Sequence, residues 1–372
     1  MRASFGSRVS RFQHVDLRST GPLIMRDPTR LPVTLLTMVL LTAACSLAPT
    51  SRVYYRERDI GSQSTFEPLS SSLQYVLDSV QVESFDTADY GRDLRDVLQH
   101  LGSPGHEIEA DGGWRRFINA EVFPIDGDHL DDSAAILPNV FLHCLGGGML
   151  FRKQAEWFAA HDYPAPWLLA GVVAMSTEIL GEAIEKPASA NTDEIADVLL
   201  WRPLGLWLYG DDERASWIRH NLDPVDWPNQ LIWDANQERW RNAGMNFVFR
   251  PSLLAGESTR FFAYTGMTNL FGLSHELPNG DTLSWGGGTA TVHIEPVRLR
   301  WSAGLFYERD DSLLASLLVH GAEGYAVRAN VYPGALGEPG MWWSRAGLFV
   351  GIDDDGATTV GVQWLLPIGL GG

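Results

Sequence analysis

Two glutamates, Glu178 and Glu182, lie four residues apart within an apolar segment that spans residues 167–184. This spacing places both carboxylates on one face of a helix. His143 lies in the preceding apolar segment, and Asp193 lies in the polar stretch that follows. Carboxylates among apolar neighbours have raised pKa values, which is the usual state of a general acid. These four side chains are therefore candidates for a general acid/base pair or a metal site.

A structural interpretation of the same residues stays open. Carboxylates beside a bend also cap helix ends and satisfy buried backbone amides, and caps are commoner than catalytic groups. Ser189, Asn191 and Asp193 form a polar bend, and Asn191 with Glu194 three residues later has the spacing of a capping box. The helical Glu-x-x-His repeat of carboxylate-bridged metal centres is absent. The sequence alone therefore establishes neither a metal site nor a catalytic role.

A further candidate catalytic residue is His275, which follows Ser274. A histidine that activates a serine is the nucleophile pair of acyl hydrolases. However, no serine lies two residues after His275, and residues 278–280 have the composition of a plain turn. The aspartates at 353–355 lack the spaced ligands of a calcium loop. Because phosphate loops, dinucleotide-binding glycines and His-Glu-x-x-His helices are also absent, we expect no cofactor.

Three helices are expected to position the candidate residues. They cover residues 141–158, where the glycines at 146–148 loosen the helix, then 167–184, and then 193 to about 208. Each segment has roughly 18 residues, which is close to the length that crosses a membrane. Their glutamates and glycines favour a buried bundle over a transmembrane hairpin.

From Asn246 onward the hydrophobic period changes to two. In residues 297–308, apolar side chains at odd positions alternate with mostly polar or small ones at even positions. Similar alternation recurs in residues 325–332, 342–352 and 360–366, with turn residues between them. We therefore predict a mainly β protein with an α-helical bundle. The β part is expected to be an antiparallel, outer-membrane-like barrel of about eight or more strands, joined to two or three apolar helices.

Alternation alone does not say which face of the barrel is wet. A soluble barrel hides its apolar residues inside, whereas a membrane barrel presents them to lipid. Aromatic residues near the strand ends and small inward residues favour the membrane barrel. An eight-stranded barrel has room inside only for side chains. The helices therefore lie beneath the barrel unless earlier segments add strands, and the sequence leaves this choice open.

The formal net charge is −18, and Lys153 and Lys186 are the only lysines. A nucleic-acid partner requires clustered cations that displace counterions from phosphates, and no basic stripe occurs here. We therefore expect no nucleic-acid partner.

The N-terminal region has the features of a secretory signal. Arg26 and Arg30 precede an apolar run, residues 31–44, that is too short to span a bilayer and ends at Cys45. Residues 41–45 resemble the lipobox of bacterial lipoproteins, which implies acylation of Cys45 and, with Ser46 next, sorting to the outer membrane. A plain signal peptide is the alternative. After cleavage Cys144 is the one remaining cysteine, and we expect a small buried hydrophobic residue there.

These observations divide the chain into six expected parts. They are a signal region at 1–44, in which 1–24 has the character of an upstream extension; a tether and mixed polar segment at 45–113, with a helix near 91–101; a strand and acidic loop at 114–137; a helical hairpin or bundle at 138–210; a linker at 211–243; and barrel strands at 244–372.

The region 138–251 resembles a bacterial domain-of-unknown-function family in which a helical hairpin precedes an outer-membrane-type barrel. The residues that match the family pattern are His143, the segment 177–182, Pro187, Ser189, Asn191, Asp193 and Gly205. Thr177 departs from the tryptophan of the family, and Thr192 is an extra residue in the bend. The family has no settled activity, so the resemblance implies architecture and leaves function open.

Two functions are consistent with the sequence. The first is a non-enzymatic outer-membrane lipoprotein of a Gram-negative envelope, anchored through Cys45, in contact with outer-membrane lipid and with a structural role or a role in handling small solutes or lipids. The alternative is an envelope lipid-modifying enzyme, similar to an acyl hydrolase, that uses His143, Glu178, Glu182 or His275.

Overall fold

The computed structural model describes residues 49–77, 89–123, 139–185, 192–228, 231–241, 244–254, 256, 258–293, 298–322, 324–336, 344, 346–363 and 368–371. These residues belong to one unit of the chain, Ala44–Gly372. The predicted lipidation site Cys45 and the bend residues Ser189 and Asn191 lie outside the described residues.

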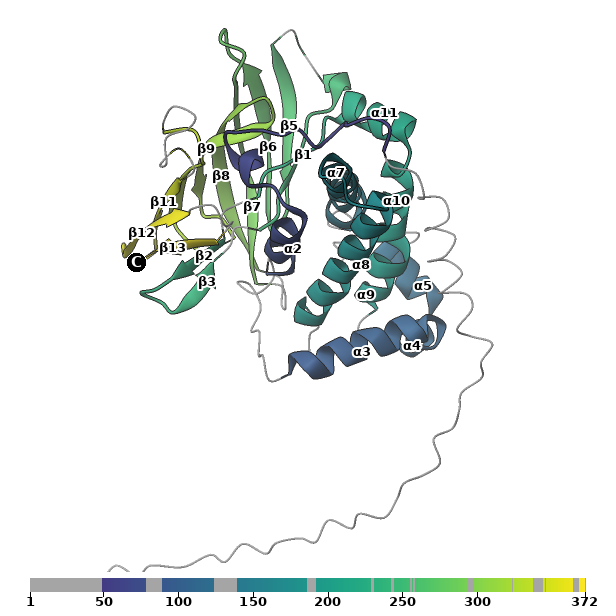
Figure 1. Cartoon of the computed structure of the whole chain (residues 1–372). Helices are drawn as coiled ribbons and strands as arrows, with labels where there is room; N and C mark the ends of the chain where they lie inside the picture. The colour runs from purple at the N-terminus through teal and green to yellow at the C-terminus, as the bar shows by residue number, and fades with distance from the viewer. Residues whose placement is uncertain are drawn as a thin grey trace, which may run out of the picture. The chain divides into compact units, whose positions relative to one another are not determined.

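The helices come first along the chain and form one region of the protein (Figure 1). They are η1 Ser62–Thr65, α2 Pro68–Val76, α3 Tyr90–Gly102, α4 Pro104–Ala110, α5 Trp114–Phe117, η3 Ile118–Val122, η6 Asn139–Gly146, α7 Gly147–Ala160, α8 Pro166–Glu185, α9 Asp193–Ala196, η7 Asp197–Trp201, α10 Arg202–Tyr209, α11 Asp212–Leu222 and η8 Ser252–Leu254. The helices predicted near 91–101 and at 141–158, 167–184 and 193–208 are confirmed by α3, by η6 with α7, by α8, and by α9 with η7 and α10.

The strands build one sheet of 13 members within the described residues. They are β1 Val225–Asp226, β2 Leu231–Asp234, β3 Arg239–Arg241, β4 Phe247–Phe249, β5 Thr259–Thr265, β6 Thr268–Glu276, β7 Thr282–His293, β8 Arg298–Arg309, β9 Ser312–Val319, β10 Val327–Val331, β11 Gly347–Ile352, β12 Thr358–Gln363 and β13 Ile368–Gly371. Their order is β1-β4-β5-β6-β7-β8-β9-β10-β11-β12-β13-β2-β3. Neighbours are antiparallel except β13 and β2, which are parallel.

Short turns explain the antiparallel order. Asp310 and Asp311 connect β8 to β9 with φ values of 51° and 70°, a left-handed conformation that aspartate tolerates and that two-residue hairpins require. Gly280, at φ 84°, lies in the turn between β6 and β7. The mainly antiparallel β architecture is therefore confirmed. The sheet is curled. Within the described residues β1 and β3 are its two edge strands and do not pair with each other, so closure into a barrel is not seen.

The sheet has an apolar exposed face and a buried face that combines polar side chains with a cluster of large apolar ones, among them Phe262, Leu270 and Phe306. In β8, Trp301 and Leu305 are 59% and 42% exposed, whereas Ser302 and Glu308 are each 2% exposed. Directly paired residues share a face, and one apolar row crosses seven strands, with every member exposed except the half-buried Ala329. This row comprises Leu273, Trp285, Leu305, Leu317, Ala329, Val350 and Val360. The next row along β6 and β7 pairs the buried Ser274 and Ser284.

The helices pack against one end of the sheet. A shared core joins Met149, Leu150 and Tyr209 of the helices to Phe247 and Phe249 of β4. At the glycines at 146–148 the first helix changes from the π-helical η6 to the α-helical α7, and these glycines let other groups approach it. A Cβ at Gly146 would overlap the ring of Phe247. Close packing of the helix on the strand therefore requires glycine at this position.

Two structural assignments made from the sequence are wrong. The segment expected as a strand, 114–123, is helical in α5 and η3, because Trp114, Phe117, Ile118 and Val122 recur at helical spacing. The expected linker at 211–243 contains α11 and supplies β1, β2 and β3 to the sheet.

The expected tether packs against the helices where the structure describes it. The backbone amides of Val53, Tyr54 and Tyr55 donate to the carboxylate of Glu156, at 2.9, 2.7 and 2.7 Å. Glu156 is itself buried and bonded to Arg152 in the same helix, α7. The sequence pattern had suggested apolar helices, but α7 buries charged residues and is therefore not uniformly apolar.

Candidate functional site

Three helical segments bring a histidine and three carboxylates together. His143 comes from η6, Glu178 and Glu182 from α8, and Asp197 from η7. Nδ1 of His143 bonds Oε1 of Glu178, and Nε2 of His143 lies 3.6 Å from Oδ2 of Asp197. Donor atoms of His143, Glu178 and Glu182 all lie within 4.8 Å of one another. We call these four residues the histidine–carboxylate centre.

Local helix geometry points these side chains inward. His143 and Asp197 both lie in π-helical turns, η6 and η7, and a third such turn, η3, carries Glu121 nearby. An extra residue in a helical turn redirects the side chains around it, and such turns are frequent at functional sites. The clustering of three of them around one group of ionisable residues therefore marks this region of the bundle.

Arg202 and Tyr75 complete the surroundings of the centre. Nη2 of Arg202 bonds Oε2 of Glu178, and the guanidinium lies 5.2 Å from the centroid of the Tyr75 ring. The hydroxyl of Tyr75 lies 3.2 Å from Nδ1 of His143. A Cβ at Gly147 would overlap Nη1 of Arg202, so this glycine makes room for the guanidinium.

Burial controls the protonation of this region. Burial lowers the pKa of His143 to about 4, with the positive charge of Arg202 adding to the effect. Burial raises the pKa of Asp197, and the nearby charges of Asp193 and Glu182 raise it further. Burial also raises the pKa of Glu121 to about 9, assisted by Asp193, to which it is hydrogen-bonded. At neutral pH the centre therefore contains a neutral imidazole, and the carboxyl of Asp197 binds its proton more tightly than an exposed aspartate would.

The centre can support two kinds of chemistry. A neutral imidazole hydrogen-bonded to a carboxylate is the arrangement of a general base with its orienting group. Neutral imidazole and carboxylate oxygens are also ligands for divalent transition metals. One oxygen of Asp197, Oδ1, is buried and makes no hydrogen bond, so this carboxyl retains capacity for a further partner.

The structure brings together three of the predicted residues, His143, Glu178 and Glu182. Asp193 lies beside them as the hydrogen-bond partner of Glu121. α9 begins at Asp193 after Thr192, and Glu194 contacts His100 at 2.5 Å. Asn191, the other member of the predicted capping box, lies outside the described residues.

His275 lies apart from this group, in β6, where its Nδ1 is 2.8 Å from Oγ1 of Thr259. Its neighbour Ser274 is buried and hydrogen-bonded to Ser284 at 2.6 Å. Successive strand residues point to opposite faces, so Ser274 and His275 do not form a nucleophile pair. Cys144 is buried in an apolar cluster, as predicted, and burial raises the pKa of its thiol to about 11.

Sequence reasoning missed Tyr75, Glu121, Asp197 and Arg202. Asp197 could have been predicted from the sequence, because it lies four residues after the candidate Asp193 and therefore shares its helical face. Glu121 was hidden by the mistaken strand at 114–123. For Tyr75, only the tertiary fold reveals the contact.

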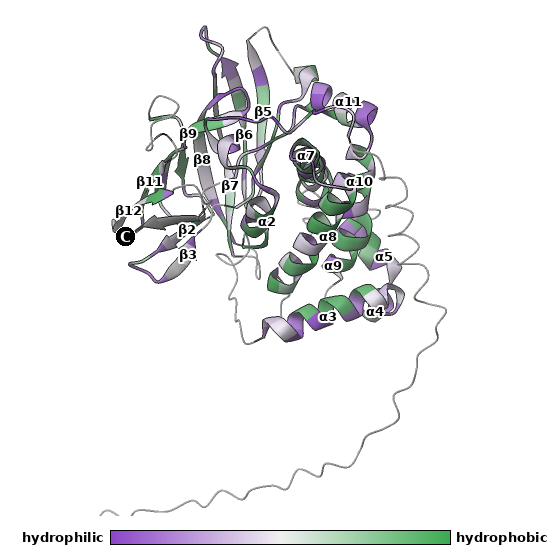
Figure 2. Cartoon of the chain, in the orientation of Figure 1, coloured by the Kyte–Doolittle hydropathy of each residue, from purple (hydrophilic) through white to green (hydrophobic). Residues whose placement is uncertain are grey.

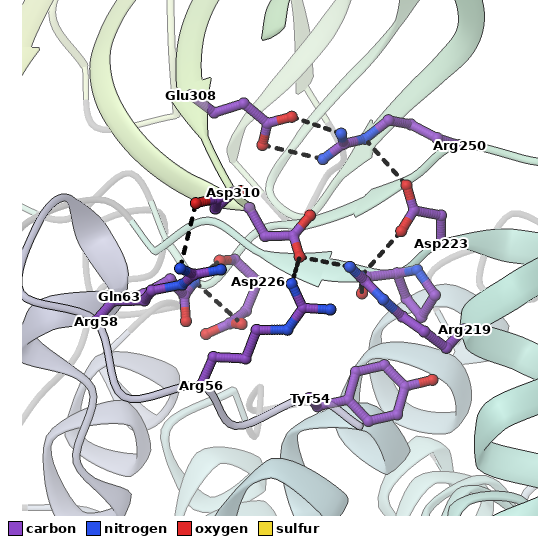
Figure 3. Close-up of polar contacts among 12 residues, drawn as sticks. Tyr54, Arg56, Arg58, Gln63, Arg219, Asp223, Asp226, Arg250, Glu308 and Asp310 are labelled. Atoms are coloured by element: carbon purple, nitrogen blue, oxygen red, sulfur yellow. Dashed lines mark hydrogen bonds and ion pairs between the residues drawn. The ribbon is translucent and has the colours of Figure 1, made fainter. Parts of the chain in front are cut away.

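A second charged network lies between the helices and the sheet (Figure 3). Arg250 bonds both oxygens of Glu308, and Arg219 bonds Asp311 and lies 2.9 Å from Asp223. Arg56 and Arg58 of the N-terminal segment also reach this network, through Asp311 at 3.8 Å and Asp310 at 3.2 Å. Because each of these arginines has a carboxylate partner, the network ties α11, the N-terminal segment and the β8–β9 turn together.

α8 is the one helix of the described residues that is long and apolar enough to cross a membrane, and it is largely hydrophobic in Figure 2. Half of its most apolar stretch is buried inside the protein. No family model, curated protein or solved structure matches the chain. What the protein does must therefore be inferred from its own residues.

Proposed function

We propose that this chain is an outer-membrane protein of the bacterial envelope, whose sheet places its exposed face in lipid. The observation that carries this proposal is the polarity of the two faces. Large apolar side chains on the strands are exposed at Phe271, Leu273, Trp285, Leu299, Trp301, Leu305, Leu317, Leu348, Val350, Ile352, Val360 and Val362. The opposite face buries Ser274, Ser284, Ser302, Glu308, Ser316, Arg328, Asn330, Thr359 and Gln363.

Exposing the apolar face of the sheet to water would be energetically unfavourable. Apolar area exposed to water costs about 25 cal/mol per Å² relative to burial, and soluble monomers rarely expose apolar patches beyond a few hundred Å². A soluble sheet also has no reason to bury serine, asparagine and arginine while exposing leucine and tryptophan. A membrane barrel has this polarity, with lipid outside and polar groups inside.

Strand length supports the same conclusion. β6, β7 and β8 have 9, 12 and 12 residues, and a tilted strand of about 9 to 11 residues crosses the hydrocarbon layer. A sheet in lipid cannot leave its edge amides unpaired, so we propose that the curled sheet closes into a barrel in the membrane. The lipobox-like sequence at Cys45 supports a lipid anchor on the same protein.

The role that fits this architecture is structural or concerns the handling of lipids or small solutes at the membrane. The test is extraction from the envelope and gel migration with and without heating. We expect detergent to be required for extraction and migration to change on heating, because a closed barrel resists unfolding by detergent. A Cys45→Ala variant that is fully water-soluble would contradict the proposal, and Cys144→Ala serves as the control for cysteine loss.

A second candidate function is an enzyme that modifies envelope lipids. It is favoured by the neutral imidazole of His143 beside Glu178 and Arg202. The discriminating experiment compares the envelope lipids of Glu178→Gln and His275→Ala variants with those of the wild type. A change in lipid composition with Glu178→Gln alone supports the enzyme. Unchanged lipids in both variants, with the membrane location preserved, favour the non-enzymatic role.

A further inference from the structure

We propose that the histidine–carboxylate centre binds one divalent transition-metal ion of the zinc class, with His143, Glu178 and Glu182 as ligands and Asp197 as the fourth. This site is independent of the membrane proposal, since it lies wholly within the helices. The first support is geometry: donor atoms of the three ligands lie within 4.8 Å of one another. Ligands about 2.1 Å from one tetrahedral ion are roughly 3.4 Å apart, so a small adjustment of side chains closes the set.

Burial of negative charge is the second support. The side chains of Glu178 and Asp197 are 0% and 2% exposed. Removing carboxylates from water is costly unless a cation or several hydrogen bonds compensate. Arg202 offsets the charge of Glu178 by a direct ion pair. A bound dication would offset the charge of the remaining ligands.

The third support is an unused ligand atom. Oδ2 of Asp197 faces Nε2 of His143 at 3.6 Å, and Oδ1 of the same carboxylate is buried without a hydrogen-bond partner. Buried polar atoms are almost always hydrogen-bonded, so an unsatisfied oxygen calls for an explanation. An ion coordinated by Asp197 would satisfy it.

The donor set defines the class of metal. One imidazole with carboxylate oxygens suits Zn²⁺, Mn²⁺ or Fe²⁺, whereas calcium and magnesium sites are built from oxygen alone. The thiol of Cys144, next to His143 in sequence, packs in an apolar cluster with Phe117 and Ile195. A thiolate ligand is therefore not part of the set. Arg202 and Tyr75 contact the ligands and would orient them, as outer-shell groups do in metal sites.

The test is metal binding by detergent-purified full-length protein. The protein is stripped with a chelator and titrated with ZnCl₂ and, separately, MnCl₂, by calorimetry and by elemental analysis after dialysis. We expect one equivalent of tightly bound metal and a rise in melting temperature. The isosteric variants Glu182→Gln and Asp197→Asn should each weaken binding at least about tenfold, and His143→Ala should abolish it.

His275→Ala is the matched control, because it removes a histidine far from the centre, and it should bind like the wild type. Circular dichroism shows whether each variant remains folded, and the two isosteric variants keep the test valid if His143→Ala unfolds. Absence of stoichiometric binding by the wild type, or binding undiminished in the folded Glu182→Gln and Asp197→Asn variants, would overturn the proposal. Neither result would affect the membrane extraction experiment.

Discussion

At the scale of single residues, the centre depends on small and charged groups that fit closely. Arg202 reaches Glu178 through a space that a side chain at Gly147 would fill. Buried groups of this kind are costly to disturb, because a displaced partner leaves a charge unpaired in a region without water. The stability of the bundle and the state of the centre are therefore linked.

Gly147→Ala should destabilise the protein. The new methyl group overlaps the guanidinium of Arg202, and overpacking of this kind costs about 1 to 3 kcal/mol. The free energy of unfolding is measured by denaturant titration in detergent. Gly171→Ala in α8 is the control: its methyl group meets only Phe151, at 4.0 Å, so it should be neutral or stabilising. Equal stability of the two variants would contradict the packing described for Arg202.

Glu121→Gln should change how stability depends on pH. The pKa of Glu121 rises from 4.5 to about 9 on folding, so between these values the folded protein keeps a proton that the unfolded chain has lost. Its contribution to stability is therefore complete below about pH 4.5 and is lost as the pH rises toward 9.

The variant should lose less stability than the wild type across this window, as measured by unfolding at pH 5, 7 and 9. Glu109→Gln removes the same charge at an exposed position and serves as the control. If the wild type and Glu121→Gln follow parallel pH profiles, Glu121 does not hold a proton in the folded state.

At the scale of elements, a buried ion pair fastens the helices to the sheet. Nζ of Lys153 in α7 lies 2.6 and 2.8 Å from the two carboxylate oxygens of Asp226 in β1. It also contacts Gln63 and lies 3.9 Å from the centroid of the Phe66 ring. Burial lowers the pKa of this lysine, while Asp226 opposes that shift.

Lys153→Ala should cost about 3 to 5 kcal/mol, because it leaves Asp226 buried without its counter-charge. The measurement is equilibrium unfolding in urea. Lys153→Met combined with Asp226→Leu removes both charges and should recover part of the loss. The control is Arg92→Ala, which breaks an exposed pair with Asp89 that is worth about 0 to 1 kcal/mol. A loss with Lys153→Ala as small as that control would show that the pair does not fasten α7 to the sheet.

Most elements of this fold could be predicted from hydrophobic period, because β8 alternates along its length and α8 is mostly apolar. The helix at 114–122 was missed because its aromatic and branched residues also favour strands. The packing of residues 53–55 depends on Glu156, about 100 positions away, and no local pattern encodes it. His143, Glu178 and Glu182 were predictable as a group because they lie in neighbouring apolar segments of the sequence. Their partners Tyr75 and Arg202 were not, because no local pattern marks those contacts.

At the scale of the whole molecule, the polarity of the two sheet faces is the observation on which the proposed membrane location rests. The row of residues that runs through Leu273, Trp285 and Leu305 is apolar across seven strands and exposed in six of them. The other face buries polar residues together with a cluster of large apolar ones that includes Phe262 and Phe306. Placing the outer face in lipid and the inner face away from it satisfies both sets of side chains at once.

Leu305→Arg should destabilise the protein in a membrane by about 2 to 4 kcal/mol, because it places a charge on the face that we propose meets lipid. The measurement is urea-induced unfolding from lipid vesicles. Leu253→Arg is the control, since Leu253 is 95% exposed in η8, outside the strands. If both substitutions have the same small effect, the outer face of β8 does not lie in lipid.

The most direct test places single spin labels along β8 in a Cys144→Ala background, with the protein in lipid vesicles. Labels at Leu299, Trp301, Ala303 and Leu305 should collide readily with oxygen, which concentrates in lipid, and be shielded from a water-soluble relaxation agent. Labels at Ser302, Gly304 and Phe306 should be shielded from lipid. Collisions of the first set with the water-soluble agent, or no alternation along the strand, would contradict the placement of this face in the membrane.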